Sequence, residues 1–398
     1  MRVKKIIELS NELEAHTIEI RRRIHQNPEI SFAEFETSKL ISSELERLGI
    51  NYEKSPVQPG LIATIDSGKP GKLLMLRADL DALPIQEETD LAFKSKNNNV
   101  MHACGHDVHA ANLLAVGAIL NSTKELWTGR VKLVFQPGEE RGGGGRRMIE
   151  QGLFDELPDA CIALHVVPIA RGQFVIGSGN LTAYSDGCRI TVHGKATHSS
   201  APQNGVDAVN IAASIIVNLN TIMAKNIDPM QASTFNIGII SGGMAPNIVP
   251  DLVEMGCMMR NVSPTARAIM QERIAAIATG TATALGGTCE VEFSPGYPSV
   301  FNDHQLTNFV TSTLKDNATM VYSGISTAEI ADEFIQTGNQ VALIAEDFGF
   351  FSQKVPSCFI QIGTGHYAAA HNQQFAVDED YIKLCTRSMA LIAIEYLR

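Results

Sequence analysis

The sequence lacks the features of a membrane-bound or disulfide-bonded protein. No apolar run reaches the roughly 18 residues that a membrane-spanning helix needs. The first residues, MRVKKIIELSNELEAH, alternate charged with apolar side chains, which is typical of an amphipathic helix and not of a signal peptide. The seven cysteines are an odd number, scattered from Cys104 to Cys385, and no CxxC pair occurs. These absences predict a reducing, cytoplasmic setting.

Positive charge is also scarce. The chain has 32 Lys and Arg against 43 Asp and Glu, a formal net charge of −11. Binding to nucleic acid or to an anionic membrane surface needs clustered cations, so neither partner is expected. With 44% hydrophobic and 19% charged residues over 398 positions, the chain has enough apolar material to fold and is long enough for two domains.

Four short apolar runs each lead into polar residues. The runs are KLLML (72–76), VKLVF (131–135), ACIAL (160–164) and CFIQI (358–362). Helical segments alternate with strand-like ones, which predicts an α/β fold with a mostly parallel, helix-covered sheet. In α/β sheets, ligands bind outside the carboxyl ends of the parallel strands. The residues that follow the ends of the four runs are Asp79, Glu139, Glu140, His165 and His366. We therefore expect one site assembled from distant segments.

The pattern changes between residues 182 and 294. Strand-like stretches with period-2 alternation, such as Cys188/Ile190/Val192, and two amphipathic helices follow in the order β-α-β-β-α-β. This order predicts an inserted ferredoxin-like domain. Residues 1–181 and 295–398 are then expected to form the α/β domain that the insertion interrupts.

The segment His102–His109 is the densest group of candidate ligands. It packs three histidines, one thiol and one carboxylate into eight residues, and these side chains bind zinc and neighbouring divalent metals. The segment opens a predicted helix, whose N-terminus favours a thiolate at Cys104 beside His106. A helix cap with ordinary histidines is the alternative. The expected buried face of the helix consists of Ala110, Leu113, Leu114 and Ala118.

Adjacent carboxylates at Glu139 and Glu140 repel each other unless a cation neutralises them. With a metal present, one carboxylate ligates it and the other serves as a general base. A surface Glu pair, a core histidine at His165 and an exposed His371 are the alternatives that the residues alone leave open.

The run Gly142–Gly145 suggests phosphate binding, because backbone amides before a helix hold phosphate. The GxxxxGK[ST] and GxGxxG patterns are absent, as are GxSxG and HExxH. A nucleotide-dependent enzyme, a serine esterase and a zincin therefore have little support.

The motifs of the chain resemble a known family, the two-metal aminoacylase and glutamate-carboxypeptidase metallopeptidases. Within it the chain is similar to the branch of hippurate hydrolases, auxin-conjugate (IAA-amino acid) hydrolases and N-acetyldiaminopimelate deacetylases. The resemblance spans essentially the whole chain. Its motifs are RADLDALPIQE (77–87), MHACGHDVHAA (101–111), VFQPGEE (134–140), ALHV (163–166), HGKATHSSAPQNGVDA (193–208), SGGMAPNIVPD (241–251), AEDFGFF (345–351) and HNQQF (371–375).

The resemblance implies two divalent metal ions per subunit in a catalytic domain formed by residues 1–181 and 295–398. It makes Cys104 the bridging ligand, with His106 and His165 on one ion and Glu140 and His371 on the other. Glu139 would be the general base. Zinc or manganese is the first expectation, with cobalt or nickel as alternatives, because thiolate and imidazole serve several metals.

The resemblance also makes residues 182–294 a lid or dimerisation domain of a homodimer. His198, Asn247 and Arg260 match lid positions that bind substrate. His198 would act with Glu139 in catalysis, by donating to the oxyanion in the partner's site, and Arg260 would hold the substrate's α-carboxylate.

The expected reaction is hydrolysis of the amide bond of an N-acyl amino acid to a carboxylic acid and a free amino acid. A dipeptidase or carboxypeptidase of the same family, and a non-catalytic binding protein on the same fold, are the alternatives. The chain departs from the family at Arg141, where relatives usually show glycine, and at Gly138, where they often show alanine. Asp79 lies where other branches place a metal-binding histidine.

Overall fold

The computed structural model describes residues 2–325, 334–338, 341–366 and 368–398. The chain divides into two compact units. The first comprises Met1–Gly179, Val300–Gln340 and Asp347–Arg398, and the second comprises Asn180–Ser299 and Val341–Glu346. The insertion expected at 182–294 lies inside the second unit, which also takes in the short segment 341–346 that the sequence pattern did not separate.

The first unit is built on an eight-stranded sheet with the order β1-β2-β4-β3-β5-β16-β6-β15. The strands are β1 (Asn51–Lys54), β2 (Leu61–Asp66), β3 (Leu73–Asp79), β4 (Arg130–Gln136), β5 (Ala160–Val167), β6 (Phe174–Val175), β15 (Ile335–Gln336) and β16 (Ser357–Gly363). The neighbouring strands β4, β3, β5 and β16 run parallel. They contain the four apolar runs, so the predicted mostly parallel sheet is confirmed.

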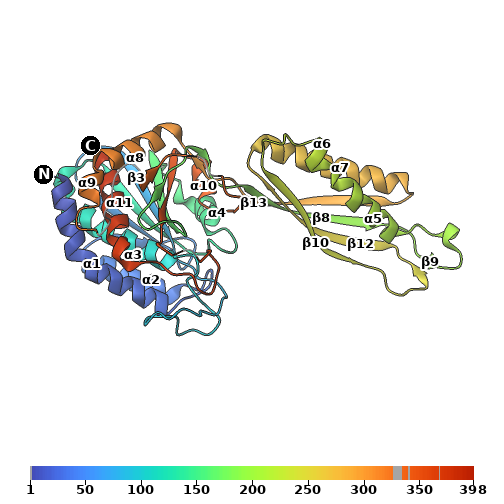
Figure 1. The fold of residues 1–398 in the computed structure, drawn as a ribbon, viewed down its shortest axis with the longest axis horizontal. Coiled ribbons are helices and arrows are strands. Elements are labelled where there is room, and N and C mark those ends of the chain that lie inside the picture. Colours follow the sequence, from blue (N-terminus) through green and yellow to red (C-terminus); the bar gives the residue numbers. More distant parts are fainter. Residues whose placement is uncertain (1, 326–333, 339–340, 367) are drawn as a thin grey trace. The chain divides into compact units, whose positions relative to one another are not determined.

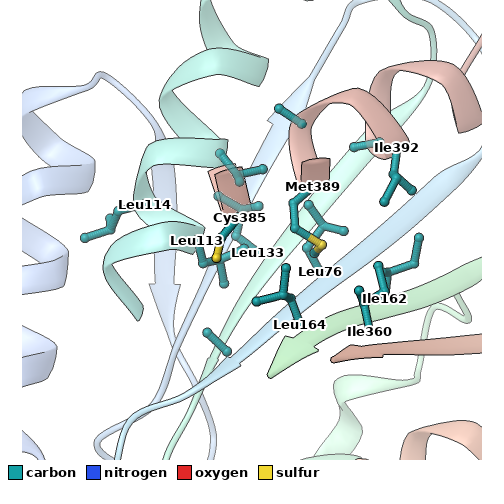
Figure 2. Packing of buried hydrophobic residues seen from close by; sticks show 14 of the residues in the cluster. Leu76, Leu113, Leu114, Leu133, Ile162, Leu164, Ile360, Cys385, Met389 and Ile392 are labelled. Atoms are coloured by element: carbon teal, nitrogen blue, oxygen red, sulfur yellow. The ribbon is translucent and has the colours of Figure 1, made fainter. Parts of the chain in front are cut away.

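Helices pack against this sheet. They are α1 (Arg2–Gln26), α2 (Phe35–Arg47), α3 (His106–Ser122), α4 (Gly144–Met148), α8 (His304–Asp316), α9 (Ala318–Val321), α10 (Gly349–Ser352) and α11 (Ile382–Tyr396). Side chains of α3 and α11, among them Leu113 and Met389, pack with Leu76 and Leu133 of the strands to form the core (Figure 2). The core therefore lies between these helices and the sheet, next to the edge where the four parallel strands end.

Helix α3 is buried on every side. The sequence predicted one buried face, but residues 106–120 are all buried, because α1 and α11 pack on the side of α3 that the sheet leaves free. The helix follows Gly105, whose φ of 85° is left-handed. A Cβ at Gly105 would lie 2.2 Å from Val166 Cγ2 of β5. Glycine thus allows the start of α3 to approach the end of β5.

The second unit has a four-stranded antiparallel sheet in the order β10-β12-β8-β13 (Figure 1). Its strands are β8 (Tyr184–His193), β10 (Ser233–Gly242), β12 (Leu252–Asn261) and β13 (Thr288–Tyr297), and its helices are α5 (Ala208–Leu219), α6 (Thr221–Lys225) and α7 (Pro264–Ala284). This is the predicted β-α-β-β-α-β order. The alternating Cys188, Ile190 and Val192 are buried against the helices, as the pattern indicated.

Only one helical segment of the described chain, Ala208–Lys225, is long and apolar enough by composition to cross a membrane. It comprises α5 and α6. Its Ile211, Ile215, Leu219 and Ile222 belong to the core of the second unit. Packing of this unit therefore accounts for its apolar character.

Candidate metal centre

Polar side chains gather where the parallel strands of the first unit end. Asp79 is the last residue of β3, His165 lies in β5, and Glu139 and Glu140 follow β4. The start of α3 brings Cys104 to the same edge. The strand ends therefore bring Asp79, Glu139, Glu140 and His165 to one edge, and their role in a single site stays a prediction.

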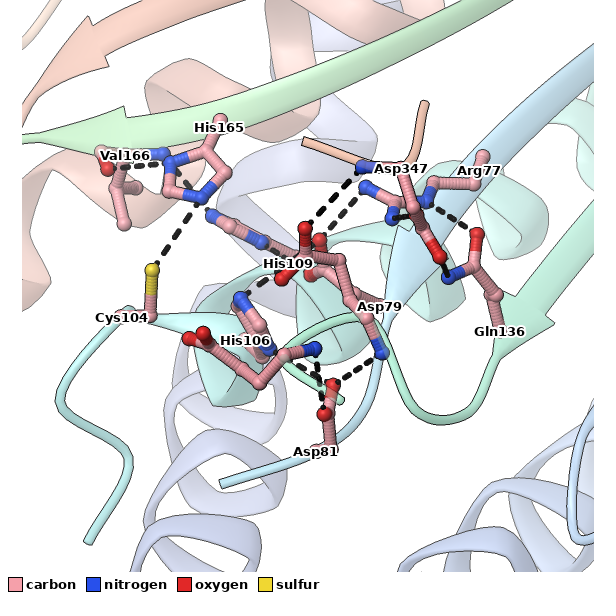
Figure 3. A network of polar contacts seen from close by, with 12 residues as sticks. Arg77, Asp79, Asp81, Cys104, His106, His109, Gln136, His165, Val166 and Asp347 are labelled. Atoms are coloured by element: carbon pink, nitrogen blue, oxygen red, sulfur yellow. Dashed lines mark hydrogen bonds and ion pairs between the residues drawn. The ribbon is translucent and has the colours of Figure 1, made fainter. Parts of the chain in front are cut away.

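The five predicted metal ligands form one cluster. Cys104 Sγ lies 3.6 Å from His165 Nε2 (Figure 3). Donor atoms of Cys104, His106 and Glu140 lie within 4.8 Å of one another. His371 Nε2 lies 3.2 Å from Glu140 Oε1. Thiol, imidazole and carboxylate donors at these separations are the kind of set that holds divalent transition metals.

The electrostatics of the cluster favour a cation. Burial raises the pKa of the Cys104 thiol to about 12, so the helix N-terminus alone does not produce the expected thiolate. Burial disfavours the protonated form of His106 and lowers its pKa. The interactions with Asp79 and Cys104 outweigh this effect and hold the pKa of His106 well above its usual value. Neither buried ring nitrogen of His106 makes an aligned hydrogen bond. A divalent cation among these donors would supply the positive charge and hold the thiolate.

Asp81 is the main site residue that the sequence reasoning missed. Its carboxylate accepts the backbone N–H of Glu139 at 3.1 Å and that of Glu140 at 2.9 Å, and its Oδ1 lies 3.3 Å from His106 Nδ1. Burial opposes its ionisation, but His106 lowers the pKa of Asp81. One carboxylate thus orients His106 and both adjacent glutamates. The second aspartate of RADLDALP was the available signal.

His109 is held away from ligation by a buried network (Figure 3). Its Nδ1 lies 2.6 Å from Asp79 Oδ1, and its Nε2 accepts the N–H of Val166 at 3.0 Å. Arg77 donates to Asp79 and to Asp347, each at 2.7 Å. Despite burial, His106 and Arg77 keep the pKa of Asp79 well below its usual value. Asp79 therefore supports the centre as an anion behind the donors.

Glu139 and Glu140 have different surroundings. Glu139 Oε1 accepts the N–H of Asp347 at 3.3 Å, whereas Glu140 meets His371 and Cys104. The Asp347 carboxylate accepts N–H groups from Gln136 and Gly145. Burial raises the pKa of Asp347 to about 6, against the effect of Arg77. The carboxylates of Glu139 and Glu140 thus contact different partners, as they must if they have different roles.

His102 does not join the cluster. It is buried, and neither ring nitrogen has a hydrogen-bond partner in the described part of the chain. Burial lowers the pKa of His102 to about 3, so the ring is neutral. His102 is therefore a packed core residue, the alternative that the sequence left open for each histidine of the segment.

The second unit holds the three predicted substrate-binding residues at two separate places. His198 in β9 (Thr197–His198) and Asn247 beside β11 (Ile248–Val249) are exposed neighbours, and Ser199 donates its N–H to the carbonyl of Asn247 at 2.9 Å. Arg260 lies eight residues along β12 from Leu252, which pairs with His193 near His198. That separation is roughly 26 Å at the usual rise of a strand.

The chain is similar to proteins of a known peptidase family. The model of peptidase family M20/M25/M40 matches residues 75–395. The chain is 37% identical to thermostable carboxypeptidase 2 of Saccharolobus solfataricus, over 99% of this chain and 98% of that protein. It is 30% identical to hippurate hydrolase of Campylobacter jejuni, over 100% of this chain and 99% of that protein.

A solved structure has the same fold. The Bacillus subtilis YXEP protein, described as a dinuclear metal binding peptidase, superposes with a TM-score of 0.83 and 30% sequence identity. The match covers 97% of this chain and 99% of that one.

Replacing Asp81 tests its orienting role. Asp81→Asn removes the negative charge that faces His106, and the amide NH₂ of asparagine would face a backbone N–H that now binds a carboxylate oxygen. We therefore expect metal affinity to fall about 10- to 100-fold. Competition with a chelator measures it. Asp66→Asn, at an exposed carboxylate ending β2, is the matched control and should leave the affinity unchanged. Equal affinities in both variants would contradict the role.

Proposed function

Since the chain belongs to peptidase family M20/M25/M40, we propose that it is a metal-dependent hydrolase of N-acyl amino acids. It would cleave the amide bond and release a carboxylic acid and the free amino acid. The observation that carries this proposal is the convergence of Cys104, His106, Glu140, His165 and His371, with Glu139 beside them.

The five ligands would hold two divalent cations, with Cys104 between them, and zinc or manganese fits the donors first, then cobalt or nickel. When bound, the cations would lower the pKa of a water and polarise the scissile carbonyl. Glu139 takes the proton of the attacking water and returns it to the leaving amine. The N–H of Asp347 supports this role because it orients one oxygen of Glu139.

The substrate class follows from the relatives and from Arg260. A hippurate hydrolase and a carboxypeptidase both act on an amide whose nitrogen belongs to an amino acid with a free carboxylate. Arg260 donates to the carbonyl of Leu343 at 2.9 Å and makes no ion pair within the described residues. Its guanidinium could therefore bind that carboxylate as a fork. A carboxypeptidase or dipeptidase is the second candidate, favoured by the 37% identity to the carboxypeptidase.

A substrate panel tests the proposed function. We expect the metal-reconstituted protein to hydrolyse N-acetyl, N-benzoyl or indoleacetyl amino acids at least tenfold faster, in kcat/KM, than dipeptides with the same C-terminal residue. Amino acid release is the measurement, and matched amides with a blocked carboxylate are the control. A preference for dipeptides would establish the second candidate instead.

The two glutamates should respond differently to amide substitution. Glu139→Gln should keep its metal and lose roughly 10²–10⁴-fold in kcat, because a positioned base is removed. Glu140→Gln should lose metal as well as activity. Metal content by elemental analysis separates the two cases, and the reverse pattern would exchange the roles.

The second unit supports a homodimer. Strand β10 is an edge of its sheet and exposes 67% of Ile239 and 59% of Ile240. Helix α5 has no charged side chain and exposes 69% of Val217, and it packs over β12, the neighbour of β10. An unpaired edge strand beside an uncharged helix face is a surface that a second copy could cover. We propose that two chains associate there.

The placement of His198 and Arg260 in the second unit supports a composite site. Arg260 lies roughly 26 Å along β12 from Leu252, and Leu252 pairs with His193, where the strand that leads to His198 ends. An amino-acid-sized substrate is therefore not expected to contact both residues of one chain. In a dimer, Arg260 and the pair His198 and Asn247 would therefore contact different substrate molecules, with His198 and Asn247 serving that of the partner. His198 would then donate to the developing oxyanion.

Mixing inactive subunits tests the composite site. Under exchange conditions, the heterodimer of His198→Ala and Glu139→Gln should recover up to about half of the parent activity, because one of its two sites is intact. Glu139→Gln mixed with Glu140→Gln is the control without recovery, since both changes lie in the same chain's part of the site. Failure of the first mixture despite proven exchange would disprove the trans role.

The cysteines fit the cytoplasmic location that we propose. All seven are free thiols, and five of them are buried. Free buried thiols persist in a reducing compartment.

A further inference from the structure

The turn that precedes α2 lies against the segment that carries the two glutamates. Ile30 forms a parallel bridge with Ala82. Ser31 Oγ donates to Asp81 at 2.6 Å, and Glu34 Oε1 accepts the backbone N–H of Gly138 at 2.8 Å. None of these turn residues has a part in the proposed mechanism.

Three consecutive backbone amides of this segment bind buried carboxyl groups. Glu34 takes the N–H of Gly138, and Asp81 takes those of Glu139 and Glu140. Both acids are at most 1% exposed. The carbonyl of Gly138 accepts the N–H of Gly144 at 3.0 Å, which closes the loop. Hydrogen bonds to Glu34, Asp81 and Gly144 therefore fix the backbone from which the Glu139 and Glu140 side chains extend.

Phe32 fills the space beneath this loop. Its own φ is 64°, a left-handed conformation that is uncommon for an aromatic residue. A Cβ at Gly138 would lie 2.4 Å from Phe32 Cζ, and one at Gly142 would lie 2.8 Å from Cε2. The guanidinium of Arg147 lies 4.6 Å from the centre of the Phe32 ring. The ring, together with the left-handed φ of 66° at Gly138, thus explains why glycine stands at position 138.

We propose that Glu34 and Phe32 are positioning residues for the hydrolytic reaction. Glu34 would hold the Gly138 amide and Phe32 would support the loop from below, so that Glu139 and Glu140 keep the directions their roles need. The proposal rests on the roles given above to these two glutamates.

The environment of Glu34 determines which substitutions are informative. Burial, and secondarily the charge of Asp81, raise the pKa of Glu34 to about 8, so Glu34 is a neutral acid at pH 7. Its Oε2 is buried without a hydrogen-bond partner among the described residues. Glutamine has the same shape and charge and keeps an oxygen for Gly138, whereas leucine removes the acceptor.

Glu34→Leu should lower kcat about 10- to 100-fold while KM changes less than about threefold. Glu34→Gln should stay within about twofold of the parent. Glu44→Leu, at another buried carboxylate of α2 that binds His16 and Arg47, is the matched control and should keep the parent kcat. Parent kcat in Glu34→Leu, or equal losses in Glu34→Gln and Glu34→Leu, would overturn the proposal.

A second pair of variants tests the loop even if Glu34→Leu does not fold. Phe32→Ala should lower kcat because the loop loses the ring beneath it, and Phe32→Leu, which refills part of that space, should lose less. Parent kcat in a folded Phe32→Ala would overturn the role of Phe32.

Hydrogen exchange separates this proposal from the proposed function. Amides 138–140 should exchange faster in Glu34→Leu than in the parent, whatever substrate the protein hydrolyses. Unchanged exchange in a folded Glu34→Leu would reject the positioning role alone. A parent that hydrolyses no amide of the panel, with faster exchange in the variant, would reject the proposed function alone.

Discussion

Buried negative charge at one edge of the parallel sheet is the constraint on which the centre of this protein depends. Asp79, Asp81, Glu139 and Asp347 are all nearly inaccessible to water. Carboxylates without solvent remain ionised only where positive charge or N–H donors compensate them. Arg77 bridges two of them, backbone amides bind a third, and the donors around Cys104 leave a place for cations.

The hydrophobic core makes this concentration of charge possible. Helix α3 lies between the sheet and the pair α1 and α11, so its first turn cannot shift away from the strand ends. Gly105 brings that turn against β5 and places Cys104 beside His165. Packing of apolar side chains therefore fixes the positions of Cys104 and His165, as a preformed site requires.

In the second unit, the candidate substrate-binding residues lie at two separate places. Its sheet holds His198 with Asn247 near one end of β12 and Arg260 near the other. Strands keep such separations rigid, so the residues cannot converge on one small substrate within a single chain. The edge strand β10 and the uncharged helix α5 are the surface on which the proposed association of two chains rests.

The sequence by itself determined the strands, the two-part organisation and the ligand candidates. Apolar periodicity is local and indicates the strands, and the polar residues after them made Glu140 and His165 candidates. The density of candidate ligands in residues 102–109 did the same for Cys104 and His106, and the family resemblance implied their roles. Only the tertiary structure decided the partners of these residues. The burial that raises the pKa of Cys104, the carboxylate of Asp81 shared between His106 and two glutamates, and the contact of Glu34 with Gly138, 104 positions away, arise from chain segments far apart in sequence. No local pattern encodes them, because desolvation and hydrogen bonding depend on which distant atoms exclude water.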